Sequence, residues 1–471
     1  MTLNKKQIYF ILFLICIVSR IFTSIYYIED IDSLRFALSL KEFDITRLQP
    51  HFPGYAVFYF FSKVINLITG STGISFSIIG GTSVFLIIIY TLKICRIDLN
   101  SRIGVFSFLL IFFNPIIWIM SNRYMPDLFG LSISTLIIFY LLYENKKFYN
   151  LKVGFFLTGI LAGIRLSYLP FILAPFLINV LKEKQRLTLL LFFFSGCVIW
   201  LIPLIFTSGV DSFFSSAIKH SRGHFTNFGG TIITDPDWTL RLVNLFKGIW
   251  SDGFGGYWKG RSWQTIILSI SFLYILKLGF KALVKNYKFE ESLKLLILST
   301  IIYLGWIFFF QNVIYKSRHI LPVLILIFVI IILGQKYIQN TNKIFINIII
   351  GVYFLSLISI TTNLVLQHKQ PNSICELKDS MKNLPNDATI ISFPLINFYL
   401  KSHGLKNSFK NIENVADLQN LNLENIENTF LVGNFISSDA MKYSFILDTV
   451  FFHNPYVNRM WAKIERYKIL E

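Results

Sequence analysis

Long apolar runs, separated by short polar segments, recur from residue 8 to about residue 364. A transmembrane helix needs about 20 apolar residues to cross the hydrocarbon core of a bilayer. The pattern therefore predicts an all-α polytopic membrane protein that ends in a polar tail. We predict eleven transmembrane helices, over residues 8–28, 74–92, 103–121, 125–143, 152–166, 167–181, 187–206, 263–280, 294–312, 320–335 and 343–365.

Two apolar stretches decide this count. Residues 54–69 are short, and Lys63 interrupts their middle. Because a charge at the bilayer centre costs about 3 kcal/mol or more, we predict an amphipathic or re-entrant helix in the outer interface there. Residues 152–181 contain Arg165 and a proline near their middle, and we interpret them as two short spans joined by a turn.

Composition and charge agree with a membrane protein. Of the 471 residues 54% are hydrophobic and only 15% are charged, whereas soluble domains carry about 25% charged residues. The first apolar run is longer than that of a signal peptide, and no small-residue cleavage site follows it. With the N-terminus in the cytoplasm, the short loops on that side are basic, as the positive-inside rule requires. The net charge of +18 therefore indicates loop anchoring and not a nucleic-acid partner.

This orientation places two loops, residues 29–73 and 207–262, and the polar tail outside the cytoplasm. We expect a multi-pass transmembrane module over residues 1–365 and a small extracytoplasmic α/β domain over residues 366–471. The tail alternates strand-like runs (ATIISF, TFLVGNF, YSFILDTVFF) with helical stretches such as residues 394–403. The four cysteines form no paired framework and the seven histidines show no ligand spacing, so we assign no metal site.

Candidate chemistry lies in the first external loop. Glu29, Asp30 and Asp32 follow the first apolar run directly. Glu29 and Asp32 would share one face of a helix, and partial burial at a membrane edge raises the pKa of a carboxylate toward the range of a general base. The alternative is an ordinary solvated helix end. The segment QPHFPGY, residues 49–55, then forms a rigid turn, because its two prolines fix φ and Gly54 permits a tight bend.

The loop sequence DSLRFALSLKEFDITRLQPHFPGYAVFYFFSKV resembles the first external loop of bacterial GT-C superfamily glycosyltransferases. These enzymes are relatives of the protein O-mannosyltransferases and the aminoarabinose transferases. Phe52 stands where a second proline is commoner. The positions that match the pattern are Asp32, Ser33, Phe36, Ala37, Leu38, Phe43, Asp44, Gln49, Pro50, His51, Pro53, Gly54 and Tyr55.

Three later elements are similar to elements of the same family, in the same order. NRYMPDLFGL supplies Arg123 and Asp127, and GILAGIRLSYLP supplies Arg165. YKSRHILPVL supplies Arg318, with His319 where tyrosine is usual. The resemblance covers about residues 8–335, and the tail beyond residue 366 is not diagnostic.

The resemblance implies a glycosyltransferase that takes a sugar from a polyprenyl phosphate on the outer face of the membrane, with inversion. It implies that a first-loop carboxylate is the catalytic base, and we choose Asp32, with Asp30 and Glu29 as alternatives. A departing phosphate needs cations, and the candidates at predicted outer ends of spans are Arg165, Arg318, His319 and Lys316. Arg165 and Arg318 have the alternative role of snorkelling anchors, and Asp127 that of a helix cap.

The remaining candidates line the external loops. In the loop over residues 207–262, aromatic, glycine and polar residues suit contact with a sugar or a lipid headgroup, and they also suit an ordinary interfacial loop. We expect the substrate-loop residues to be His51, Pro53, Gly54, Tyr55, Arg123, Asp127, His224 and Trp258.

The expected partners are a polyprenyl-phosphate-linked sugar, membrane lipid and an acceptor that is a protein, a lipid or a polysaccharide. No cofactor is assigned, and dependence on a divalent metal stays open. The expected location is the plasma membrane, or the inner membrane if the source is bacterial. Three alternative functions are a lipid-linked oligosaccharide flippase or other transporter, an oligosaccharide polymerase or ligase, and a scaffold without enzymatic activity. Against transport, the carboxylates lie at a membrane edge, and no inverted repeat is visible.

Overall fold

A computed structural model describes residues 4–144, 148–286, 290–338, 344–385, 387–413, 417–418, 428–434 and 444–470. The chain divides into two compact units. We call Met1–Ser24 with Arg35–Leu366 the membrane unit, and Ile25–Leu34 with Gln367–Glu471 the tail unit. The first-loop acids therefore belong to the tail unit, although most of that unit lies far from them in the sequence.

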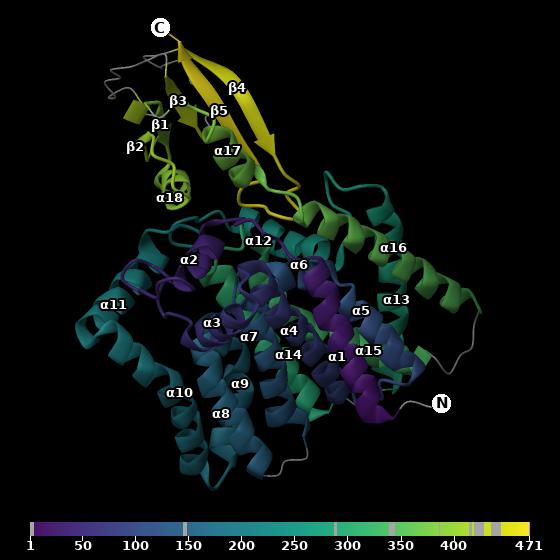
Figure 1. The fold of residues 1–471 in the computed structure, drawn as a ribbon. Coiled ribbons are helices and arrows are strands. Elements are labelled where there is room, and N and C mark those ends of the chain that lie inside the picture. The colour runs from purple at the N-terminus through teal and green to yellow at the C-terminus, as the bar shows by residue number, and fades with distance from the viewer. Residues whose placement is uncertain are drawn as a thin grey trace. The chain divides into compact units, whose positions relative to one another are not determined.

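The membrane unit is built of packed helices (Figure 1). Within the described residues, each of the eleven predicted spans overlaps one or two of these helices. Short π- or 3-10-helical segments lie at η1 (Phe139–Tyr143), η2 (Leu166–Tyr168), η3 (Gly248–Gly253) and η4 (Ser317–Ile320). The α-helices in chain order are α1 (Lys5–Phe22), α2 (Ile31–Ser39), α3 (Ala56–Thr69), α4 (Thr72–Cys95), α5 (Arg102–Phe112), α6 (Pro115–Asn122), α7 (Asp127–Ile138), α8 (Phe148–Arg165), α9 (Leu169–Lys182), α10 (Arg186–Ser208), α11 (Val210–Thr226), α12 (Trp238–Lys247), α13 (Gln264–Asn286), α14 (Glu291–Phe310), α15 (Leu321–Ile338) and α16 (Ile344–His368).

Helix length and composition confirm a polytopic membrane protein. Among the described residues, seven helical runs are long and apolar enough to cross a bilayer, and the bent α5–α6 pair makes eight. The eleven predicted spans also included α1 and α7. Helix α1 carries three basic residues, and α7 is shorter than any of the seven runs. The prediction further counted α8 and α9 separately, whereas by length these two helices form one run of 35 residues.

The run that contains α8 and α9 turns back on itself. The rings of Phe155 in α8 and Phe176 in α9 lie 4.5 Å apart between centroids. In one straight helix, residues this far apart in sequence would be separated by about 30 Å. The chain therefore reverses at Leu166–Tyr168, and the prediction of two short helices joined near Arg165 is confirmed.

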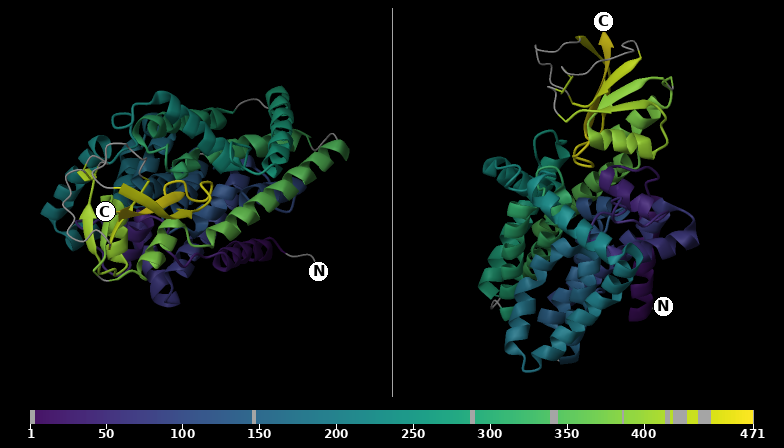
Figure 2. Two further views of the ribbon diagram at one scale, coloured as in Figure 1. Left: turned by 90° about the horizontal axis from the view of Figure 1, so that it is seen from above. Right: turned by 90° about the vertical axis from the view of Figure 1, so that its left-hand side faces the viewer.

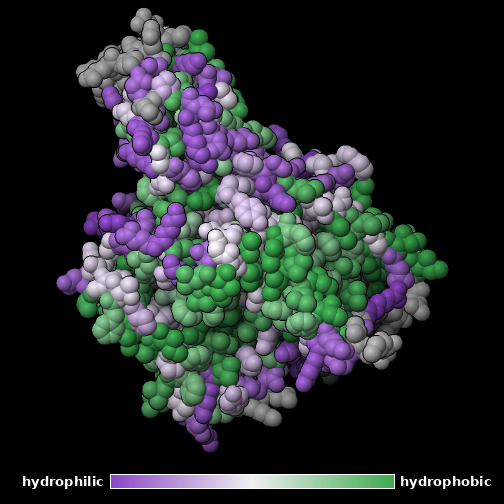
Figure 3. Space-filling view, in the orientation of Figure 1, coloured by the Kyte–Doolittle hydropathy of each residue, from purple (hydrophilic) through white to green (hydrophobic). Residues whose placement is uncertain are grey.

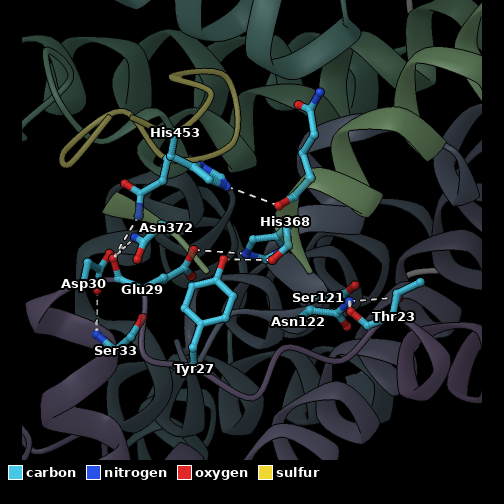
Figure 4. Close-up of polar contacts among 12 residues, drawn as sticks. Thr23, Tyr27, Glu29, Asp30, Ser33, Ser121, Asn122, His368, Asn372 and His453 are labelled. Carbon is cyan, nitrogen blue, oxygen red and sulfur yellow. Dashed lines mark hydrogen bonds and ion pairs between the residues drawn. The ribbon is translucent and has the colours of Figure 1, made fainter. Parts of the chain in front are cut away.

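The first helix ends earlier than predicted. Residues 8–28 were expected to form one span, but α1 stops at Phe22, and Thr23 is its C-cap. The side-chain amide of Asn122 donates hydrogen bonds to the Thr23 carbonyl (2.5 Å) and hydroxyl (2.8 Å) (Figure 4). The Trp118 indole donates to the same hydroxyl. These contacts from α6 satisfy polar groups at the helix end, so the chain continues to α2 without helical structure.

The helix predicted at the outer interface is present as α3. Its 14 residues span about 21 Å, which is short for a bilayer core of about 30 Å. Lys63, the residue that argued against a span, donates a hydrogen bond to the Leu40 carbonyl at 2.5 Å. Placement of α3 in the interface remains a prediction.

Apolar side chains also cover much of the face of the membrane unit that Figure 3 shows. Large hydrophobic residues such as Phe22, Ile68, Leu181 and Phe206 are mostly exposed on its helices. An exposed apolar surface of this extent is typical of contact with lipid.

The tail unit contains a five-stranded sheet in the described residues, with strand order β2-β1-β3-β5-β4 (Figure 2). β1 pairs in parallel with β2 and β3, while β5 is antiparallel to β3 and β4. The predicted α/β class is confirmed. The strands and added helices are β1 (Thr389–Ser392), β2 (Ser408–Asn411), β3 (Thr429–Val432), β4 (Ser444–Phe452), β5 (Lys463–Leu470), α17 (Ser373–Met381) and α18 (Pro394–Ser402).

The three strand-like runs of the sequence lie on β1, β3 and β4, although Phe435 and Tyr443 at the ends of two runs are outside the described residues. β2 and β5 were not predicted, because polar and charged residues interrupt their sequences and leave no apolar run. The core of the sheet is made by Ile391, Ile412, Leu418, Leu431 and Ile469.

Candidate functional site

A buried charge cluster lies in the membrane unit at the ends of three helical segments. Asp127 is the first residue of α7, Arg165 the last residue of α8, and Arg318 lies in η4. The Asp127 carboxylate is 2.9 Å from Nη2 of Arg165 and 3.7 Å from Nε of Arg318. The three side chains are at most 8% exposed and together carry one net positive charge. Such a cluster suits an anionic ligand.

The QPHFPGY turn adds a tyrosine and a histidine to this cluster. Arg165 Nη1 donates a hydrogen bond to the Tyr55 hydroxyl at 3.2 Å, and that hydroxyl is 2.8 Å from His51 Nε2. Gly54 has φ +80°, and a Cβ there would lie 3.2 Å from Ile45 and Leu204 side-chain atoms. A glycine is therefore needed for the turn to present Tyr55 to Arg165.

Phe36 of α2 packs against this turn. Its ring centroid is 5.1 Å from that of Tyr55 and 6.2 Å from that of His51. Asp32 precedes Phe36 by four residues on the same helix, so the two side chains share a face of α2.

A second side of the cluster is formed by histidines. Tyr303 Oη donates a hydrogen bond to the His319 carbonyl at 3.0 Å, and His224 Nε2 donates to the Phe310 carbonyl at 2.8 Å. Burial lowers the pKa of His224; the bond to Phe310 opposes this, and the nearby charges of Lys316 and Arg165 lower the pKa further. His224 is therefore a neutral hydrogen-bond donor at neutral pH.

Close packing of α7 against the end of α8 depends on Gly130. A Cβ at Gly130 would lie 2.8 Å from the Cβ of Arg165 and 3.2 Å from the ring of Tyr168. Carbon atoms that are not bonded do not approach so closely. Only a glycine at position 130 therefore lets Arg165 reach Asp127, which lies one turn before Gly130 on α7.

The structure thus brings together most of the residues predicted to bind the donor phosphate. Arg165 and Arg318 contact Asp127, while His319, Lys316 and His224 lie within range of one another's charges. The roles of these residues remain predictions.

Other predicted substrate-loop residues have different surroundings. Trp258 packs against Phe246, with ring centroids 6.0 Å apart. Arg123 caps the C-terminal end of α6, and its carbonyl accepts a hydrogen bond from the Met125 amide. Pro53 is buried within the turn.

Three residues of the cluster were not predicted from the sequence. The ring of Tyr168 lies 5.9 Å from the guanidinium carbon of Arg165 and 5.9 Å from the ring of Tyr303, measured to ring centroids. Both tyrosines are fully buried. The His220 ring of α11 stacks on His51 with centroids 4.9 Å apart. Tyr168 lies within the GILAGIRLSYLP element, and this position is the signal that could have identified it.

The first-loop acids lie in the tail unit and differ in their surroundings. Glu29 is fully buried, and its carboxylate is 3.0 Å from His368 Nε2 (Figure 4). Asp30 caps α2, because its Oδ1 accepts the Ser33 amide at 2.7 Å. Asp32 lies in the first turn of α2 and is 9% exposed, against 0% for Glu29 and 3% for Asp30.

The chain superimposes on the crystal structure of ArnT from Cupriavidus metallidurans bound to undecaprenyl phosphate, with a TM-score of 0.54. The match covers 98% of this chain and 97% of that chain at 10% sequence identity. This chain has the GT-C fold. The fold that the first-loop resemblance implied is therefore confirmed.

Two further structures match the chain at lower TM-scores. The apo form of the same ArnT matches with a TM-score of 0.48 and 10% identity, over 98% of each chain. The oligosaccharyltransferase of Archaeoglobus fulgidus in complex with zinc and sulfate matches with a TM-score of 0.47 and 11% identity, over 84% of this chain and 62% of that chain. No family model and no curated protein sequence matches the chain. In the part of the chain that the structure describes, no group of three or more His, Cys, Asp or Glu could hold a metal ion.

Proposed function

We propose that this chain is a glycosyltransferase that moves a sugar from a polyprenyl-phosphate donor to an acceptor on the extracytoplasmic side of the membrane. The observation that carries the proposal is the buried cluster of Arg165 and Arg318 around Asp127, with one net positive charge. The GT-C fold supports it, since the ArnT structure with this fold is bound to undecaprenyl phosphate.

In the proposed reaction the two arginines bind the donor phosphate and stabilise the charge that develops as it leaves. Guanidinium groups bind phosphate oxygens in pairs, and their charge counts for more where water is excluded. Asp127 orients Arg165 through the 2.9 Å contact, and Tyr55 holds a second edge of the same guanidinium. Lys316 adds a further positive charge, and the imidazole of His319 can hydrogen-bond a phosphate oxygen.

We assign the base to Asp32. Glu29 is fully buried against His368, and Asp30 is engaged as a helix cap, so both have structural roles. Asp32 accepts the proton of the acceptor hydroxyl or amine, whose oxygen or nitrogen forms a bond to the anomeric carbon. The bond from that carbon to phosphate breaks, and the polyprenyl phosphate leaves with the electron pair. One displacement of this kind inverts the configuration.

The proposal includes the location of the reaction. The N-terminus lies in the cytoplasm, and the acids and residues 366–471 lie outside the cytoplasm, at the plasma membrane or the bacterial inner membrane. Basic loops on one side of the predicted spans support this orientation.

The proposal is tested by mass spectrometry of lipids extracted from cells that carry Asp32→Asn at matched protein levels. Asp44→Asn is the matched control, because Asp44 is in the same loop and its Oδ1, kept by asparagine, accepts the Thr46 amide at 2.8 Å. We expect a polyprenyl-phosphate monosaccharide to accumulate with Asp32→Asn only. Accumulation of a lipid-linked oligosaccharide would favour the polymerase, ligase or flippase alternatives. Unchanged lipids in the Asp32, Asp30 and Glu29 variants would contradict enzymatic transfer.

A further inference from the structure

The segment that carries the first-loop acids is bound by side chains of the tail. Between α1 and α2 the chain has no helix, so its backbone carbonyls need other partners. The Tyr399 hydroxyl donates a hydrogen bond to the Ile28 carbonyl at 2.6 Å. The side-chain amides of Asn372 and Asn458 both donate to the Glu29 carbonyl, at 2.6 and 2.9 Å.

The side chain of Glu29 is bound in the same place. Its Oε2 is 3.0 Å from Nε2 of His368, and the Tyr27 hydroxyl donates to the His368 carbonyl at 2.8 Å (Figure 4). Glu29 and His368 are 0% and 1% exposed. A carboxylate enclosed in this way has no path to a large acceptor, but it holds the chain firmly.

The residues that hold the segment come from separate elements of the tail unit. His368 ends α16, Tyr399 lies in α18, and Asn458 lies between β4 and β5. Asn372 is the N-cap of α17: its Oδ1 accepts the Cys375 amide at 3.3 Å while its Nδ2 reaches Glu29. Only the folded tail can bring these groups together, since they span some 90 residues of sequence.

We propose that the tail unit positions the catalytic loop. In this inference, which rests on the proposed function, His368, Asn372, Tyr399 and Asn458 form a clamp on Ile28 and Glu29. The clamp fixes the chain just before the Asp30 cap, and therefore fixes the start of α2 and the direction of Asp32 in its first turn. Glu29 and the clamp residues are positioning residues and do not touch the substrate.

The clamp predicts that two variants of Glu29 differ in activity, whereas a catalytic role for Glu29 predicts that both lose activity equally. Glu29→Gln keeps a hydrogen-bonding group facing His368, whereas Glu29→Ala removes it. If Glu29 is a positioning residue, Glu29→Gln should retain at least half of the transfer rate, while Glu29→Ala should lose tenfold or more. Equal loss in both variants would overturn the positioning role.

Kinetics with the lipid-linked sugar extracted from Asp32→Asn cells test the tail directly. Asn372→Asp keeps the oxygen that caps α17 but replaces the donor to Glu29 by an acceptor, and Asn458→Ala removes the other donor. We expect both to lower kcat tenfold or more with KM for the donor changed less than twofold. The control is Asn407→Ala, whose amide bonds Pro385 elsewhere in the tail. A raised acceptor KM with unchanged kcat would overturn the inference in favour of a tail that binds acceptor.

Hydrogen exchange provides a readout that does not depend on the reaction. In Asn372→Asp and Asn458→Ala, the amides of α2 should exchange at least tenfold faster while those of β1 and β3 stay protected. Unchanged exchange in α2 would overturn the clamp even if Asp32→Asn is inactive. Faster exchange in α2 with an active Asp32→Asn would support the clamp and contradict the assignment of the base.

Discussion

The approach of Arg165 to Asp127 depends on the missing side chain of Gly130, which makes Gly130→Ala a sharp test of the cluster. The added Cβ would lie 2.8 Å from Arg165 Cβ and 3.2 Å from the Tyr168 ring. Because Arg165 Cβ is attached to the backbone, the end of α8 must move. Overpacking of this kind costs about 1–3 kcal/mol.

A matched substitution separates this cost from the general preference of helices for alanine. Gly305 lies within α14, and a Cβ there meets no atom within 4 Å. Replacing either glycine by alanine gains about 1 kcal/mol of helix propensity. The gain is common to both, so Gly130→Ala should be less stable than Gly305→Ala by about 1–3 kcal/mol.

Thermal unfolding with a fluorogenic thiol reagent measures this difference, because Cys16 and Cys95 are buried in the folded protein. The same assay with added undecaprenyl phosphate reports binding, since a ligand that binds only the folded state raises the melting temperature. We expect a smaller rise for Gly130→Ala than for Gly305→Ala. Equal melting temperatures and equal rises would refute the view that this close contact positions Arg165.

Further predictions concern the charge cluster and the tail. Arg165→Gln should destabilise the protein by about 1–3 kcal/mol, because Asp127 loses its 2.9 Å partner and keeps only Arg318, at 3.7 Å. In the Asp127→Asn background, Arg165→Gln should cost less in thermal unfolding than it does in the wild type, and an equal cost would contradict the pairing. Burial lowers the pKa of His403, and the charges of Lys378 and Lys382 lower it further, against its bond to the Tyr399 carbonyl. The folded tail therefore binds fewer protons than the unfolded tail, so its stability is complete above a pH of about 6.5 and falls as the pH drops through the lowered pKa. Limited proteolysis of the tail should be faster at a pH of about 5 than at about 7, and His403→Gln should reduce this dependence; an unchanged dependence would contradict the assignment.

Three short sequence elements predicted much of the candidate site through their resemblance to GT-C glycosyltransferases. These elements supply Arg165, Arg318 and Asp127, which meet in the membrane unit. Tyr168 and Tyr303 did not stand out, because buried tyrosines are common in a chain with 22 of them. The partners of Glu29 could not be predicted, because hydrogen bonds to a backbone carbonyl leave no spacing in the sequence.

By itself the sequence determined the membrane class, the approximate positions of the long apolar helices and the α/β character of the tail. Each follows from local hydrophobic patterns, which need no information about distant residues. Only the tertiary structure decided where α1 ends, how Arg165 reaches Asp127 and that residues 25–34 belong with the tail. These depend on contacts from far along the chain: Asn122 at Thr23, Gly130 beside Arg165, and Asn458 at Glu29. A local pattern states what a segment must bury, but only packing determines which distant groups satisfy its backbone.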